Sequence, residues 1–432
     1  YYRPGDQLRN LDVSDNHLML STDQKIFIHD GQAIVDSIND PKCNQVIRLN
    51  SNTYMAAGER FGVRYWVNKE ISRYFNPNGP ADDRVYSARY MNGKVFLSSG
   101  GFNSSRFPAF RTEGYYEFKN ERWDNYRTEE ISPLPEGKDI MDVIESDDGR
   151  TRYIASFLRG LIRQRNGEYD TVFNYYNSAL SFAQLLNDTQ QVRVAALDYD
   201  RDGNLWMTNN LSDSPIVVKT TNNKWYSYST NGNNWLFDME VDSNNQIWAV
   251  NNGNATKGIV VYNTNGTLAD RSDDQFARFS TGATSGNLPS ETVYSLAVDR
   301  RGELWIGTAD GVAVIYSTFN AFNGAQAQRI LIQSGGEAGY LLEGQQVNDI
   351  KVDGGNRKWM ATNSGVWLVS EDGTEILYNF NVDNSPLSSN TVNELAVNNR
   401  TGEVFMATSE GIVSFRSEAA AVEEVEYSAY TF

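Results

Sequence analysis

The sequence of 432 residues has very little of the chemistry on which many enzymes depend. Histidine occurs only at His17 and His29, and cysteine occurs only at Cys43. A histidine-based catalytic triad or a metal site built from several histidines is therefore excluded from most of the chain. An internal disulfide is excluded as well, because it needs two thiols. We interpret both histidines as ordinary surface or strand-end residues.

Long hydrophobic runs are missing too. No segment approaches the roughly 18 to 20 consecutive apolar residues of a membrane-spanning helix, and stretches with helical periodicity are almost absent. The chain begins at Tyr1 without the pattern of a signal peptide. We therefore expect a mature product or an excised piece of a longer protein.

Positive charge is scarce, with 38 lysines and arginines against 55 aspartates and glutamates and a formal charge of −17. Such a charge repels nucleic acid and anionic lipid surfaces over at least a Debye length, so both are poor partners. Catalysis by two carboxylates stays open, since the separation of about 5 to 9.5 Å between them is invisible in a sequence. No motif supports an enzyme, and we predict a non-catalytic protein without a cofactor.

What the sequence does contain is an internal repeat. The segment RRGELWIGTADGVAVIY at 300–316 returns in altered form along the chain, with a bulky residue shortly after a turn. Nine copies align on this residue, at Leu18, Tyr54, Phe96, Tyr153, Trp206, Trp248, Trp305, Trp359 and Phe405. Spacings of 36 to 57 residues between successive copies indicate a repeat architecture.

Each copy predicts a small antiparallel sheet. Residues 293–298, 304–308 and 312–316 predict three short strands, joined by turns at 299–302 and 310–311. In another copy, residues 220–230 predict a fourth, outer strand. Four-stranded units of roughly 40 to 50 residues are typical of propeller blades, with the bulky residue packed between neighbouring blades. A parallel solenoid is disfavoured, because its repeats usually span about 20 to 30 residues.

We therefore predict an all-β protein, a β-propeller built from about nine four-stranded blades. Residues 1–80 are assigned to blades of a preceding or incomplete propeller and residues 81–417 to a seven-bladed ring. Residues 418–432, which are acidic and rich in alanine, are assigned to a linker to an absent C-terminal domain. A ring formed by the first seven copies is the alternative grouping.

One segment is similar to the opening of a calcium-binding loop, with Asp198, Asp200 and Asp202 ahead of Gly203. Position twelve of such a loop is Asn209 here, in place of the glutamate that the pattern requires. The other copies are expected to match Asp198 with Asp242, Asp299 and Asp353, without the remaining ligands. We favour a blade turn over a metal site.

Residues 292–316 and 347–374 closely resemble the two-component-regulator propeller repeat, known mostly from Bacteroidetes. The resemblance is specific at Asp299, Gly302, Leu304, Trp305, Gly307, Thr308, Asp310 and Gly311, and weaker before about residue 190. Two groups of proteins carry such repeats: periplasmic sensor halves of hybrid two-component systems, and PorZ-type surface components of the type IX secretion system.

The C-terminal third favours the PorZ-type family, because residues 311–332 and 354–419 resemble the end of its propellers. This resemblance implies a non-catalytic scaffold at the cell surface, associated with the outer membrane. It also implies partners of the PorU, PorV and PorQ type and a role in delivering anionic lipopolysaccharide to the sortase. A periplasmic glycan-sensing domain and a carbohydrate-active propeller enzyme remain as alternatives.

The densest basic cluster lies at 157–165 and contains Arg159, Arg163 and Arg165. Strand alternation predicts that Arg163 and Arg165 share one face, which we hypothesise to meet a sugar phosphate. The alternative is an edge strand protected by its charge. In the insertion at 100–118, Phe107 and Phe110 either serve a protein interface or pack the loop down.

Overall fold

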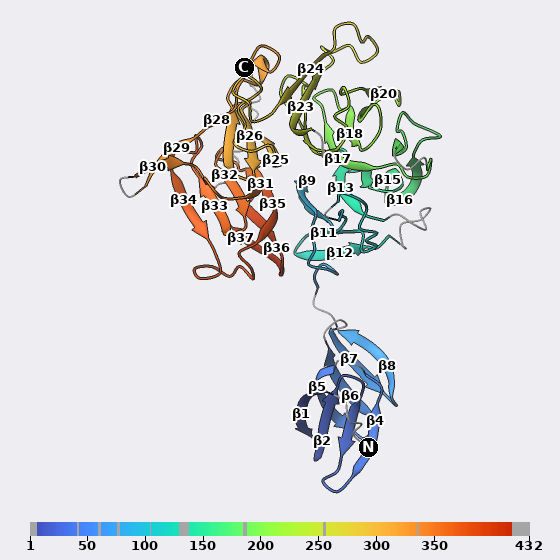
Figure 1. Ribbon diagram of the computed structural model, residues 1–432. Coiled ribbons are helices and arrows are strands. Elements are labelled where there is room, and N and C mark those ends of the chain that lie inside the picture. The colour runs from blue at the N-terminus through green and yellow to red at the C-terminus, as the bar shows by residue number, and fades with distance from the viewer. Residues whose placement is uncertain are drawn as a thin grey trace, which may run out of the picture. The chain divides into compact units, whose positions relative to one another are not determined.

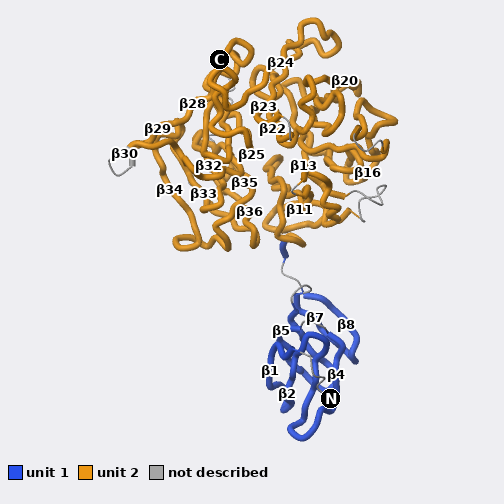
Figure 2. Tube along the Cα trace, viewed as in Figure 1, with its two compact units in different colours: residues 1–79 blue, residues 80–432 orange. Residues whose placement is uncertain are grey.

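The computed structural model describes residues 7–40, 43–58, 62–75, 78–103, 105–128, 138–184, 188–253, 256–334 and 337–416. The chain divides into two compact units, Tyr1–Gly79 and Pro80–Phe432 (Figure 2). Both consist of antiparallel sheets in which successive strands pair (Figure 1), so the all-β prediction is confirmed. None of the helices in the described part of the chain has the length and apolarity that crossing a membrane requires.

The first unit contains two four-stranded sheets. Their strands are β1 (Leu8–Ser14), β2 (His17–Thr22), β3 (Ile26–His29), β4 (Ile34–Ile38), β5 (Cys43–Asn50), β6 (Thr53–Gly58), β7 (Gly62–Val67) and β8 (Glu70–Phe75). Buried residues of both sheets, among them Met19, Val46 and Tyr54, form one core. Two consecutive repeats thus pack against each other as neighbouring blades.

Seven sheets of three or four strands follow in the second unit. Six are four-stranded: β9 (Ser87–Met91) to β12 (Arg122–Tyr126), β13 (Ile140–Glu145) to β16 (Glu168–Phe173), β17 (Val194–Tyr199) to β20 (Trp225–Tyr228), β21 (Leu236–Val241) to β24 (Gln275–Phe279), β25 (Val293–Val298) to β28 (Gln328–Arg329), and β31 (Val347–Val352) to β34 (Ile376–Phe380). The seventh has three strands within the described residues, β35 (Val392–Asn398), β36 (Glu403–Thr408) and β37 (Gly411–Arg416). A two-stranded ribbon, β29 (Leu331–Ser334) and β30 (Glu337–Tyr340), precedes β31.

These seven sheets close into a ring. The first strand of each sheet contacts the first strand of the next one, and β35 of the last sheet contacts β9 of the first. This closure is the geometry of a propeller, in which the first strands surround the axis. The predicted seven-bladed ring with blades of a second propeller is confirmed. The predicted linker at 418–432 lies outside the described residues.

The predicted strands of a single copy are also found. β25 and β26 (Leu304–Thr308) have the predicted bounds, and β27 (Gly311–Ile315) begins one residue earlier than expected. The outer strand predicted within 220–230 is β20. Local turn chemistry and alternation therefore suffice to define a blade, because every pairing inside it joins strands adjacent in the sequence.

The aligned bulky residues all lie on the second strand of their sheets, and the four tryptophans are buried. Each indole Nε1 donates to an aspartate six residues earlier: Trp206 to Asp200 at 2.8 Å, Trp248 to Asp242 at 3.1 Å, Trp305 to Asp299 at 3.4 Å and Trp359 to Asp353 at 3.1 Å. The same carboxylates accept backbone amides two and four residues further on. One aspartate thus closes the hairpin turn and orients the buried ring.

This arrangement corrects the expected alignment of the acidic residues. Asp200, and not Asp198, occupies the position of the other three aspartates. Asp198 lies on β17 and accepts the backbone amides of Tyr199 and Val241, at 2.9 and 2.8 Å. Because Asp198 faces the neighbouring first strand while Asp200 is used by its own turn, the two do not converge on a common ion. No group of three or more potential metal ligands occurs among the described residues.

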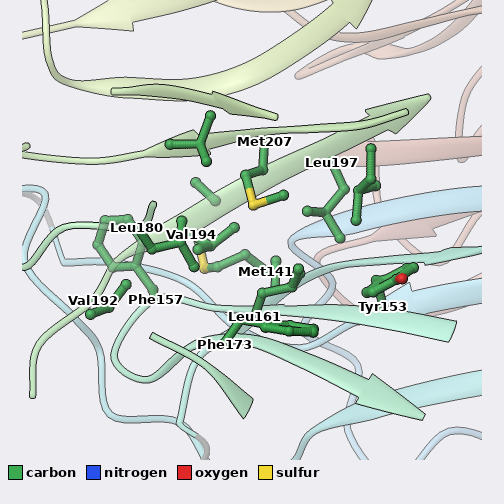
Figure 3. Packing of buried hydrophobic residues seen from close by; sticks show 14 of the residues in the cluster. Met141, Tyr153, Phe157, Leu161, Phe173, Leu180, Val192, Val194, Leu197 and Met207 are labelled. Atoms are coloured by element: carbon green, nitrogen blue, oxygen red, sulfur yellow. The ribbon is translucent and has the colours of Figure 1, made fainter. Parts of the chain in front are cut away.

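Hydrophobic clusters between neighbouring blades hold the ring rigid. Figure 3 shows the largest of these, between the sheets of β13 and β17, where Met141, Phe157, Leu161, Val194 and Met207 pack together. All five side chains are buried completely. Burial of apolar area of this kind stabilises a fold by roughly 25 cal/mol per Å². The first strands are therefore held in fixed positions around the axis.

Candidate functional site

The first strands of all seven blades line a cavity of about 480 Å³. Carboxylates contribute much of its polar lining, together with three cationic side chains. The charged residues are Asp142, Asp238, Glu240, Asp349, Glu394, Arg89, Arg106 and Lys351. A carbohydrate-active enzyme would require carboxylates that face each other in the centre of the ring. The contacts of these side chains therefore show whether they are held by the fold or are available for catalysis.

Four acidic residues on these strands connect neighbouring blades. Each accepts the amide of the residue that follows it and one amide of the next blade. The second bonds run from Leu197 to Asp142 at 3.0 Å, from Val241 to Asp198 at 2.8 Å, from Leu296 to Asp238 at 3.1 Å and from Leu395 to Asp349 at 2.9 Å. These carboxylates replace backbone hydrogen bonds that separate sheets do not make, so their role is structural.

Two cations partly neutralise this acidic ring. Arg89 Nη2 lies 3.0 Å from Asp142 Oδ2 and donates to the carbonyl of Leu197 at 2.8 Å. Lys351 Nζ donates to Asp349 Oδ1 at 2.9 Å. Both pairs lie beside the hydrogen bonds between blades, and they strengthen the same connections.

Glu240 and Glu394 also line the cavity, but they differ from the four acidic residues that connect the blades. Their side chains form no hydrogen bond within the described part of the chain. Burial and the neighbouring Asp198 and Asp238 raise the pKa of Glu240 well above its usual value. Burial and Asp349 do the same for the pKa of Glu394. Burial also raises the pKa of Asp238 to about 6. Burial and neighbouring carboxylates therefore make these three carboxyl groups of the cavity weaker acids than usual.

The basic cluster predicted from the sequence is divided by the structure. Arg163 forms two hydrogen bonds with Asp170, at 2.8 and 3.1 Å, and Arg165 Nε lies 3.5 Å from the same carboxylate. Both arginines thus lie on one side of β15 (Gly160–Arg165), as alternation predicted. Arg159 precedes β15 and donates to Gln190 at 3.2 Å. The edge-strand interpretation is wrong, because β15 pairs with β14 (Thr151–Ser156) on one side and β16 on the other.

The two predicted aromatic residues have different surroundings. Phe107 is 38% exposed, and its ring lies edge-on to Trp235 at 6.4 Å between centroids. The guanidinium of Arg193 lies 5.5 Å from the Phe107 ring. Phe110 is 59% exposed, although its backbone amide is held by Asp139 at 2.8 Å. Phe107 thus packs partly against Trp235 and Arg193, whereas Phe110 is largely exposed, with the ammonium of Lys138 5.8 Å from its ring centroid.

Sequence reasoning missed Lys219, at the end of β19 (Ile216–Lys219). Its Nζ lies 5.6 Å from the centroid of the Tyr153 ring, and Tyr153 is the cross-strand neighbour of Arg163. Lys219 therefore joins the Arg163 and Arg165 pair from the next blade. Its only signal in the sequence is a lysine at the end of an apolar strand.

Comparison with known proteins supports the architecture. Residues 287–310 match the family model described as the two component regulator propeller. The chain is also similar to PorZ, a surface component of the type-IX secretion system of Porphyromonas gingivalis, with a TM-score of 0.80 and 25% identity over 95% of this chain. The chain thus has a propeller fold that is similar in structure to PorZ. It spans 57% of the PorZ chain to which it is similar.

The propeller of this chain shares its fold with enzymes as well. A streptogramin B lyase matches 84% of this chain at 14% identity, and a virginiamycin B lyase from Staphylococcus aureus matches 78% at 13%, both with a TM-score of 0.52. The matched regions cover 97% of the streptogramin B lyase chain and 96% of the virginiamycin B lyase chain. No curated protein sequence matches the chain.

Proposed function

We propose that the chain is a non-catalytic surface scaffold of the type IX secretion attachment complex. The observation that carries this proposal is the likeness to PorZ, which extends over 95% of the chain at a TM-score of 0.80. The same likeness supports a location at the cell surface, associated with the outer membrane. A structural role for four of the acidic residues near the axis supports a function without catalysis.

In this role the propeller works with proteins of the PorU, PorV and PorQ type and helps to deliver anionic lipopolysaccharide to the sortase. Arg159, Arg163 and Arg165 are the residues that we assign to the anionic glycolipid, since the body of the protein repels it. Phe107 and Phe110 are assigned to a protein partner, because exposed aromatic residues next to a rigid scaffold are frequent anchors of interfaces.

Deletion of the gene in its own bacterium tests the proposal. We expect secreted cargo to lose its lipopolysaccharide conjugate, and affinity purification of the tagged full-length protein to recover the sortase and the barrel protein. Complementation with the intact gene is the control. Unchanged cargo conjugation after deletion would contradict the proposal.

The sensor alternative is tested by the gene itself. A β-sandwich encoded after residue 432 supports the scaffold, whereas a membrane helix followed by a kinase supports a periplasmic glycan sensor. Both outcomes are read from the genomic sequence on either side of the coding region for residues 1–432.

Glu240 and Glu394 keep the carbohydrate-active alternative testable. Their carboxyl groups line the central cavity with raised pKa values, a property that general acids share. For the scaffold we expect no release of reducing sugar from bacterial surface glycans, either by the wild type or by Glu240→Gln and Glu394→Gln. Release that both variants abolish would favour the enzyme.

A further inference from the structure

Lys219 is a buried cation without an acidic partner among the described residues. It is 6% exposed, and its ammonium lies over the Tyr153 ring at 5.6 Å. Its Nζ forms no hydrogen bond or ion pair with any other residue that the structure describes. Burying an ammonium without a carboxylate is costly, and a contact with one aromatic face offsets only part of that cost.

Two neighbouring cations on β15, Arg163 and Arg165, increase this cost. Both lie beside Asp170 on β16, and Arg163 pairs with Tyr153 across the strands. Burial together with the two guanidinium groups lowers the pKa of Lys219 to about 8. The cluster thus contains three cations and one carboxylate, and that carboxylate pairs with the two arginines. This is an excess of two positive charges on a protein whose formal charge is −17.

The cluster is open on the side of Arg165. The Arg165 side chain is 50% exposed, whereas that of Arg163 is 11% exposed and its Nε and Nη2 are engaged by Asp170 and Thr171. An anion that approaches from solvent therefore reaches the half-exposed guanidinium of Arg165 before the buried ammonium of Lys219. A guanidinium and an ammonium in this order are common binding partners of oxyanions.

We propose that Lys219, Arg163 and Arg165 form a binding site for a phosphate group, in which the anion neutralises the buried ammonium. A phosphate group carries up to two negative charges, which matches the excess of the cluster, and its oxygens accept from both types of donor. The source of this group is the phosphorylated glycan of a surface glycolipid, and to that extent the inference rests on the proposed function. Free inorganic phosphate has the same chemistry and serves as the probe.

Titration of the full chain with inorganic phosphate at constant ionic strength tests the site. We expect the affinity to fall at least about tenfold in Lys219→Met and in Arg165→Met, because each loses one donor and one charge. Lys219→Arg keeps the charge and retains binding. Lys224→Met is the matched control, since Lys224 is an exposed lysine of the same blade, and it changes the affinity less than about twofold.

The pH dependence gives an independent readout. Between pH 7 and pH 9 the affinity of the wild type falls by up to about tenfold as Lys219 loses its proton. Lys219→Arg removes this dependence. Phosphate affinity that is equal in the wild type and in Lys219→Met, or no binding by the wild type at millimolar phosphate, overturns the inference.

A second arm uses purified anionic lipopolysaccharide in place of phosphate. Weaker binding of lipopolysaccharide by Lys219→Met than by Lys224→Met supports both the site and the proposed function. Phosphate binding without lipopolysaccharide binding keeps the site and contradicts the glycolipid role. Lipopolysaccharide binding that Lys219→Met leaves unchanged keeps the glycolipid role and overturns the site.

Discussion

Lys358 Nζ lies 2.9 Å from Asp299 Oδ2, and neither side chain is exposed to solvent. Lys358 belongs to β32 (Lys358–Thr362), and Asp299 closes the turn that follows β25 of the preceding blade. The ammonium also lies 4.3 Å from the centroid of Trp305. Burial acts to raise the pKa of Asp299, but the hydrogen bond from Lys358 and weaker neighbouring interactions together outweigh it, and the pKa lies below its usual value. One ion pair therefore connects the turn, the buried ring and the next blade.

Lys358→Met is expected to destabilise the protein by about 3 to 5 kcal/mol, because it leaves the buried carboxylate of Asp299 without its cation. Denaturant unfolding of the full chain measures this change. Arg301→Met is the control: the pair of Arg301 and Glu371 is about half exposed, and its loss costs at most about 1 kcal/mol. Equal stabilities of the two variants would contradict a structural role for the buried pair.

Asp200→Asn is expected to cost about 2 kcal/mol or more, because Asp200 accepts bonds from Trp206 and from two turn amides. Asp202 is exposed, and its side chain accepts one bond from the described residues, a 3.5 Å bond from Asn245. Asp202→Asn is therefore expected to change stability little. Millimolar calcium is expected to leave the melting temperatures of the wild type, Asp200→Asn and Asp202→Asn unchanged. A calcium-dependent increase that Asp200→Asn abolishes would restore the calcium-loop interpretation.

The raised pKa of Asp238 predicts that stability decreases as the pH rises. Its folded-state pKa of about 6 lies above the usual value, so the folded protein holds more protons than the unfolded chain between about pH 4 and pH 6. The stabilising contribution is complete below pH 4 and is lost as the pH rises through 6. Melting temperatures at pH 5 and pH 7.5 should differ less in Asp238→Asn than in the wild type. Asp202→Asn serves as the control, and an equal difference in both variants would refute the assignment.

The lowered pKa of Lys219 predicts that, in the absence of phosphate, stability increases with pH in the alkaline range. Because its folded-state pKa of about 8 lies below the usual value, the unfolded chain holds more protons between about pH 8 and pH 10. Stability is expected to rise over this window, by up to about 3 kcal/mol, as the buried ammonium becomes neutral. Unfolding of Lys219→Met should show no such rise, whereas Lys224→Met should retain it. A rise that persists in Lys219→Met would assign the effect to another group.

Much of the fold was predictable because its information is local. The spacing of six residues between Asp299 and Trp305 belongs to one turn and one strand, and every strand pair within a blade joins neighbours in the sequence. Alternation along β15 likewise placed Arg163 and Arg165 on one side. The alignment of Asp198 with the turn aspartates of the other copies was wrong, because Asp198 and Asp200 are only two residues apart. Only the hydrogen bonds show that Asp200 closes the turn.

The sequence by itself determined the repeat, the strands of each blade and the buried tryptophans, since turn chemistry and side-chain alternation act over a few residues. Only the tertiary structure decided which groups meet between blades. Lys219 approaches Tyr153 and Arg163 from the next blade, and Asp349 accepts the amide of Leu395 across the ring interface. These contacts depend on the closure of seven sheets around one axis. Ring closure sets distances between residues about fifty positions apart, which no local pattern encodes.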